Sequence, residues 1–232
     1  YEKFLHRFHG NVLKSCDLIK TNQMNGADFA LRCALYWNKP LICRMGYLWS
    51  DFVDCEKGAS NITSTDVRKI ESQLFKCARK IVVTTDEMSE NILQSNHLLK
   101  SKTVVIPNYV ETDRFIPLSR DIYEFDVLFV GRLSPQKNIS TLLSALCDLD
   151  IKIMIIGDGG LRNDLKTKFG DMNNNLTWQR KIPNSDLPAL MNHSRIFILP
   201  SHYEGHPKTL IEAMACGMAV IGADSPGIRE II

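Results

Sequence analysis

The chain has 232 residues, 44% of them hydrophobic, and a formal net charge of +2 at pH 7. This composition indicates an ordinary globular protein with enough apolar material for one large or two modest cores. The balanced charge, without basic blocks or interleaved aromatic residues, gives no reason to expect nucleic acid as a partner. No apolar run approaches the roughly 20 residues with which a helix crosses a membrane.

The first half of the chain alternates short apolar strands with amphipathic helices, which is typical of a parallel sheet. Residues 1–15 place apolar and basic side chains at helical spacing. This pattern favours a helix packed on a sheet over one that lies on a membrane surface. A polar connector with Gly58 and Ser60 precedes the third helix. The expected strands are 17–21, 40–45, 81–84 and 103–106, and the expected helices are 1–15, 27–37, 66–79 and 87–99.

The second half repeats this alternation after a charged segment. Residues 111–125, which include Pro117, are expected to form an interdomain linker. We therefore predict a partial N-terminal domain over 1–118 and a C-terminal domain over 119–232. The expected strands are 127–130, 151–156, 176–179, 196–199 and 219–222, and the expected helices are 139–149, 161–169, 186–192 and 208–215.

Seven cysteines occur, an odd number and without a C-x-x-C pair. Most lie inside apolar runs, so we expect small core residues and a reducing compartment as their setting. They are Cys16, Cys33, Cys43, Cys55, Cys77, Cys147 and Cys216.

The segment IFILPSHYEGHPKTLIEAMAC, at 196–216, combines a strand, a loop and a helix. The apolar strand stops at a proline, and the polar loop that follows carries Glu204, Gly205 and His206. The start of the helix presents free backbone amides and a positive dipole end, an arrangement that suits a phosphate. Glu212 lies roughly a turn and a half into the helix, where its carboxylate can accept hydrogen bonds from hydroxyls such as those of a ribose.

Three more glycine-containing loops follow expected strands. In GRLSPQKN, Gly131 permits a close turn, Arg132 offers a fork of donors suited to a diphosphate, and Lys137 adds a point charge. The GDGG turn at 157–160 lacks the spacing of a dinucleotide fingerprint and is interpreted as architecture first. SPGIRE at 225–230 lies at the same expected edge of the sheet, as a simple turn or a ligand contact.

His202 and His206 flank Glu204, and two histidines with one glutamate can suit zinc. The three residues lie in a loop without a fourth candidate ligand nearby. We therefore predict no metal site and favour His206 as a donor to a sugar or a phosphate.

The spacing from Glu204 to Glu212, followed by EAMACG, resembles the paired-glutamate signature of the family 4 retaining glycosyltransferases. The resemblance covers residues 12–232, most strongly from 126 onward. It implies the α/β GT-B fold, with two Rossmann-like domains whose parallel sheets face each other across a cleft, the first domain being incomplete here. Members of the family are considerably longer, so the chain is expected to be a fragment.

The resemblance also implies roles for individual residues. Glu212 is expected to bind the nucleotide ribose and Glu204 to lie near the donor sugar, while Arg132 and Lys137 hold the donor diphosphate and stabilise its departure. Base contacts are expected from the backbone near 178–182. Further substrate contacts are expected from Gly131, Gly205, His206, the amides of Thr209 and Leu210, and, in the first half, Arg44 and Tyr47.

The first half departs from the family pattern. Many members carry a histidine close to the transferred sugar, but PLICRMGYLW has none. Arg44 could supply positive charge there and Tyr47 a hydroxyl, or both only line the cleft. Tyr109 stands where the family usually has glycine.

The expected function is therefore retaining, metal-independent transfer of a sugar from a nucleotide-diphosphate sugar to a glycan, lipid or small-molecule acceptor, without a cofactor. The implied setting is the cytoplasm, with peripheral attachment to the inner face of the membrane if the acceptor is a lipid or a surface polysaccharide. Two alternatives stay open: a GT-B nucleotide-sugar epimerase, and an inactive nucleotide-sugar-binding subunit. A phosphorylase would need a cofactor lysine and a far longer chain.

Overall fold

The computed structural model describes residues 5–55, 62–119, 122–170, 172 and 174–232. These residues form two compact units, Tyr1–Pro107 and Asn108–Ile232. No helix within the described ranges is long and apolar enough to cross a membrane.

The first unit is built on a parallel sheet, which in its described residues has four strands in the order β1-β2-β3-β4. Alternate side chains of the central strands, Cys43 and Ile81 among them, are fully buried and form the core with the covering helices. The strands are β1 (Ile19–Lys20), β2 (Leu41–Arg44), β3 (Lys80–Val83) and β4 (Thr103–Val105). The helices are α1 (Leu5–Ser15), α2 (Ala27–Tyr36), α3 (Trp49–Cys55), α4 (Ser64–Cys77), α5 (Asp86–Ser95) and the short 3-10 helix η2 (His97–Leu99).

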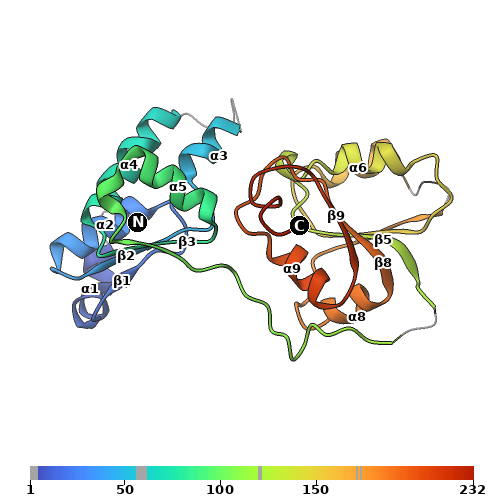
Figure 1. The fold of residues 1–232 in the computed structure, drawn as a ribbon, viewed down its shortest axis with the longest axis horizontal. Coiled ribbons are helices and arrows are strands. Elements are labelled where there is room, and N and C mark those ends of the chain that lie inside the picture. The colour runs from blue at the N-terminus through green and yellow to red at the C-terminus, as the bar shows by residue number, and fades with distance from the viewer. Residues whose placement is uncertain (1–4, 56–61, 120–121, 171, 173) are drawn as a thin grey trace. The chain divides into compact units, whose positions relative to one another are not determined.

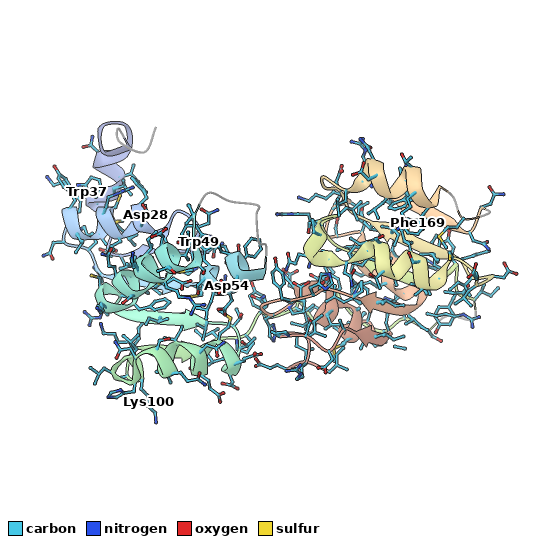
Figure 2. All side chains as sticks on the ribbon, turned by 90° about the horizontal axis from the view of Figure 1, so that it is seen from above. Asp28, Trp37, Trp49, Asp54, Lys100 and Phe169 are labelled. Atoms are coloured by element: carbon cyan, nitrogen blue, oxygen red, sulfur yellow. The ribbon has the colours of Figure 1, made fainter. Side chains whose placement is uncertain are left out.

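Sequence patterning missed helix α3, which begins at Trp49 (Figure 2). It falls in the stretch expected to be a polar connector, of which Gly58 and Ser60 lie outside the described residues. Glu71 of α4 is 5% exposed, and its Oε1 accepts the Ser50 amide at 3.1 Å, which satisfies a donor in the first turn of α3. A distant carboxylate thus stabilises this helix, and local periodicity does not reveal it.

The second unit contains a five-stranded sheet among its described residues, in the order β7-β6-β5-β8-β9, with every pairing parallel. Figure 1 shows α6 on one side of this sheet and α8 and α9 on the other. The strands are β5 (Phe125–Val130), β6 (Ile153–Ile156), β7 (Leu176–Gln179), β8 (Ser194–Leu199) and β9 (Ala219–Gly222). The helices are α6 (Ile139–Leu146), α7 (Arg162–Phe169), α8 (Leu187–Asn192), α9 (Lys208–Ala215) and the short 3-10 helix η3 (Pro135–Lys137).

The strand order of the second unit reverses between β5 and β8, because β6 and β7 extend the sheet on one side of β5 while β8 and β9 extend it on the other. In open α/β sheets, ligands bind outside the carboxyl ends of the strands at such a switch point. The loops that follow β5 and β8 are therefore the expected position of a ligand site.

The two compact units divide after Pro107, earlier than the expected boundary between 118 and 119. Phe115 is 2% exposed in the core of the second unit. The Asn192 side chain accepts the Leu118 amide at 2.7 Å and donates to the Ile116 carbonyl at 3.0 Å. Residues 115–118, which fall within the expected linker, are thus packed on the second unit.

The cysteines divide into two groups. Cys33, Cys43 and Cys216 are buried, which confirms the expectation of core residues, and burial raises the pKa of the Cys43 thiol to about 11. Cys77 and Cys147 are exposed, so the expectation is wrong for them. Both lie at the C-terminal end of a helix whose apolar residues face inward, which carries their own side chains to the surface. Cys16 is partly buried, and the side chain of Cys55 lies outside the described residues.

Candidate functional site in the second unit

Three loops of the second unit meet at the carboxyl edge of its sheet. The loop after β5 and the loop after β8 are joined by two hydrogen bonds, from the Gln136 side chain to the Tyr203 carbonyl at 2.8 Å and from the His202 amide to the Gln136 carbonyl at 2.9 Å. The loop after β9 joins them through the Glu204 amide, which donates to the Pro226 carbonyl at 3.1 Å. The structure thus brings together three motifs that are far apart in the chain.

Lys137 and Glu204 form an ion pair between two of these loops. The Lys137 Nζ lies 2.5 Å from Glu204 Oε1, and the side chains are only 15% and 9% exposed. Breaking a pair at this depth costs more free energy than breaking a surface pair, because the partner that remains is an uncompensated charge. The two residues predicted to contact the diphosphate and the sugar therefore form one fixed group.

A cavity of about 390 Å³ lies at the carboxyl ends of β5, β6 and β7. Gly131 and the exposed Arg132 line one side of it, and Ile182 lines another. The diphosphate and base contacts expected of these segments stay predictions. The full lining is Val130, Gly131, Arg132, Ile156, Gly157, Asp158, Lys181, Ile182, Asn184 and Leu187. Its size is within the range of small-molecule sites.

The GDGG turn forms the cavity wall by close backbone packing. A Cβ on Gly157 would lie 1.8 Å from the Gly131 carbonyl oxygen, and a Cβ on Gly159 would lie 2.4 Å from the Leu133 carbonyl oxygen. Any side chain at either position would separate the two loops. These glycines therefore have a structural role, which is the role that the sequence indicated.

Glu212 of α9 is buried, with 2% of its side chain exposed. Its Oε1 accepts from the Asn184 side-chain amide at 3.2 Å and lies 4.0 Å from Lys208 Nζ. Burial raises the pKa of this carboxyl, while Asn184, Lys208 and Arg114 act in the opposite direction. The carboxylate is therefore held by a small set of donors in a largely dry environment.

Glu212→Gln is expected to stabilise the second unit by about 1 kcal/mol at pH 7, because the neutral amide avoids the burial of a charge. The folded-state pKa of Glu212 is raised. The protonated form therefore stabilises the fold below the unfolded pKa of about 4.3, and this contribution is lost as pH rises through the folded pKa. Thermal unfolding across this window should show the gain of the variant shrinking toward acid.

The control for this prediction is Glu124→Gln, which changes an exposed carboxylate of the same unit. It should leave the unfolding temperature nearly unchanged at every pH, since surface substitutions usually have small effects. An equal shift in both variants, or a loss of stability in Glu212→Gln at pH 7, would contradict the argument.

His206 lies in the loop just before α9. Burial lowers the pKa of its imidazole, so the ring is neutral at pH 7. Its Nδ1 is buried and has no hydrogen-bond partner among the described residues. This nitrogen is therefore available for a further hydrogen bond, and the predicted contact of His206 with a ligand stays a prediction.

The remaining predicted residues of this segment are placed around the start of α9. Pro207 is the N-cap residue and Lys208 begins the helix. The Leu210 amide donates to the Pro207 carbonyl at 3.2 Å, and the Leu210 side chain is fully buried in the core. Thr209 follows Lys208 in the first turn, and Gly205 packs against the loop after β9.

Arg44 and Tyr47 belong to the first unit. Arg44 ends β2, where its amide and its carbonyl both bond to the Thr21 hydroxyl, at 2.9 and 2.8 Å. Its guanidinium donates to the Asn22 carbonyl at 3.4 Å. Tyr47 stacks on Phe52 with ring centroids 5.2 Å apart. Their contact with donor or acceptor stays a prediction.

Sequence reasoning missed Asn184 and Arg114. Asn184 follows β7 at the same carboxyl edge of the sheet as the predicted loops, and this position could have identified it as a candidate site residue. Arg114 lies in the segment expected to be a linker, so no pattern pointed to it. Among the described residues, no group of three or more His, Cys, Asp or Glu side chains is placed to hold a metal ion.

Residues 110–232, more than half of the chain, match the family described as Glycosyl transferases group 1. The chain belongs to this family. An uncharacterized glycosyltransferase of Methanocaldococcus jannaschii is 33% identical over 178 residues, which are 68% of this chain and 43% of that protein. The UDP-Gal:alpha-D-GlcNAc-diphosphoundecaprenol alpha-1,3-galactosyltransferase of Escherichia coli is 31% identical over 178 residues, covering 66% and 44%. The chain thus spans less than half the length of these relatives.

Two solved structures share the fold of this chain. HepE of Anabaena, in complex with UDP and glucose, superposes with a TM-score of 0.81 at 19% identity, over 98% of this chain and 66% of that one. Sucrose-phosphate synthase of Thermosynechococcus elongatus gives a TM-score of 0.81 at 20% identity, over 98% and 60%. The α/β GT-B fold with two parallel sheets, which the sequence resemblance implied, is confirmed.

Proposed function

We propose that the protein is a retaining glycosyltransferase that moves a sugar from a nucleotide-diphosphate sugar to a glycan, lipid or small-molecule acceptor. The observation that carries this proposal is the cavity at the carboxyl ends of β5, β6 and β7, with Arg132 in its lining. The partly buried Lys137–Glu204 pair lies on the adjoining loops and supports it. Membership of the family gives the reaction class.

The donor would lie with its base against Ile182 and its diphosphate beside Arg132 and the first turn of α9. A planar guanidinium can bind two phosphate oxygens at once, and the positive end of α9 adds to the attraction. The ribose hydroxyls would bond to the Glu212 carboxylate. His206 would donate to the sugar or to a phosphate oxygen.

In the reaction, the bond between the anomeric carbon and the diphosphate oxygen breaks, and a new bond forms to the acceptor oxygen on the same face of the sugar. The proton of the acceptor hydroxyl passes to the departing diphosphate. The electron pair of the broken bond goes to the diphosphate, whose growing negative charge Arg132 and Lys137 stabilise. Glu204, held by Lys137, would orient the sugar and stabilise positive charge at its ring. In this scheme, side-chain cations neutralise the leaving group without a bound metal.

Acceptor binding would fall to the first unit, with Arg44 and Tyr47 as its candidate residues. Two relatives from Escherichia coli, the galactosyltransferase named for a diphosphoundecaprenol-linked sugar and an O-antigen chain mannosyltransferase, suggest lipid-linked or polymeric glycan acceptors. A cytoplasmic setting with peripheral attachment to the membrane would follow from such acceptors.

Calorimetric titration of the full-length protein with UDP and with GDP, without added metal, tests the donor site. We expect micromolar binding of one nucleotide, weakened about 10- to 100-fold by Arg132→Ala, because a charge-assisted bidentate contact is lost. Arg195→Ala is the matched control, since Arg195 pairs with Asp126 on the surface with its side chain 61% exposed.

No binding of either nucleotide by the folded wild-type protein would overturn the donor site. If a nucleotide binds, incubation with the matching nucleotide sugar separates the alternatives. Transfer to an added glycan supports the transferase, release of nucleotide that does not depend on an acceptor indicates an epimerase, and no turnover indicates a binding subunit.

A further inference from the structure

Asn184 lies between the cavity and the buried carboxylate of Glu212. It lies in the turn after β7 and lines the cavity of about 390 Å³. Its Nδ2 donates to Glu212 Oε1 at 3.2 Å, and its Oδ1 accepts from the Arg114 guanidinium. Both ends of this one amide group are therefore engaged.

The contact with Arg114 fixes which way the amide points. An amide can be turned over so that its oxygen and nitrogen exchange places, and the hydrogen-bond partners decide between the two orientations. A guanidinium only donates, so it selects the orientation in which Asn184 Oδ1 faces Arg114 and Nδ2 faces Glu212. Arg114 is itself held by Glu111, at 3.1 Å from its Oε2.

Glu212 depends on this donor more than on its cationic neighbour. The Lys208 ammonium lies 4.0 Å away on a side chain that is 49% exposed, whereas the carboxylate side chain is 2% exposed. Lys208 also lies over the Tyr109 ring, at 5.6 Å from its centroid. Asn184 is thus the shorter contact, and it approaches from the cavity side.

We propose that Asn184 is a positioning residue that orients the Glu212 carboxylate toward the ribose hydroxyls of the nucleotide. Arg114 fixes the orientation of the Asn184 side-chain amide. This inference rests on the proposed donor site. It assigns the ability to distinguish ribose from deoxyribose to three residues, Arg114, Asn184 and Glu212, which lie on three different elements of the second unit. A carboxylate that is fixed in this way can accept from both hydroxyls of a ribose.

The test measures the affinity of the full-length protein for the better-bound nucleoside diphosphate and for its 2′-deoxy and 3′-deoxy analogues. The wild type is expected to prefer the ribose form by about 10- to 100-fold, the range for a hydrogen bond to a charged group. Asn184→Ala is expected to reduce this ratio to about 3-fold or less, since the carboxylate loses its orientation. Arg114→Gln should reduce it by a smaller factor.

The ratio separates positioning from a merely structural role, because damage to the cavity wall would weaken the ribose and deoxyribose forms equally. In a Glu212→Gln background, the Asn184→Ala change should cause no further loss of the ratio, since both act on the same contact. Asn175→Ala is the matched control, because Asn175 makes the same kind of amide-to-carboxylate bond, to Asp150 at 3.0 Å, on the surface.

An unchanged ratio in Asn184→Ala, in a protein that still binds the nucleotide, would overturn this inference and leave the donor site intact. A wild-type protein that binds the ribose and deoxyribose forms equally would also overturn it. Failure of the folded wild type to bind any nucleoside diphosphate would instead overturn the donor site itself.

Discussion

Lys137→Met is expected to destabilise the second unit by more than the roughly 1 kcal/mol of an exposed pair, because it leaves the largely buried Glu204 carboxylate without its partner. The pair is 2.5 Å apart, with 15% and 9% of the two side chains exposed. Methionine keeps the length of the lysine stem, so the loss reports the charge more than the packing. Chemical denaturation at pH 7 measures it as a lower midpoint at constant slope.

A double-mutant cycle provides the control for this prediction. Lys137→Met combined with Glu204→Gln should recover much of the lost stability, since no uncompensated charge is left. Arg195→Met, which breaks the exposed pair with Asp126, should change stability by no more than about 1 kcal/mol. If Lys137→Met were as mild as Arg195→Met, the ion pair would not hold the two loops together.

Gly227→Ala is expected to displace the Glu204 loop. The displacement should weaken binding of the sugar donor about 10-fold or more, because small shifts of the groups that contact a ligand have large effects. A Cβ at this position would lie 2.1 Å from the Gly205 carbonyl oxygen and 2.4 Å from the Glu204 carbonyl oxygen. The backbone φ of +75° adds strain of about 1–2 kcal/mol for a non-glycine residue. Donor titration and thermal unfolding measure the two effects.

Gly170→Ala separates strain from steric displacement. Gly170 also has a positive φ, +58°, but nothing lies within 4 Å of a Cβ built there. This variant should lose stability to backbone strain, because φ +58° with ψ −128° is a conformation that L residues rarely adopt, and it should keep normal donor affinity. Equal donor affinity in Gly227→Ala and Gly170→Ala would show that contact between the loop after β9 and the Glu204 loop is not needed for the site.

Sequence patterning located most elements of the second unit because their signals are local. Helix α9 begins after a proline and runs over the predicted Lys208–Ala215, and strands β7 and β9 have their predicted bounds. Apolar runs that end at glycine or proline mark buried strands and their carboxyl-edge loops without knowledge of the partners. Local signals of the same kind identified the loop of Gly131 and Arg132, which lines the cavity.

Tertiary contacts decided what the local patterns could not. Helix α3 depends on the Glu71 carboxylate from another helix, and the boundary between the units depends on Phe115, whose burial no local periodicity reveals. In the candidate site, the sequence supplied Lys137 and Glu204 as separate charges, and only the fold makes them partners.

The amino-acid sequence by itself located the strands and most of the helices, because these follow from short-range spacing of residue types, and its resemblance to a known family supplied the candidate residues of the donor site. Only the tertiary structure decided which of those residues touch, and it added Arg114 and Asn184 to Glu212. The physical reason is that hydrogen bonds and ion pairs between loops depend on distances set by the packed sheet, and residues 70 positions apart carry no local signal of such contacts.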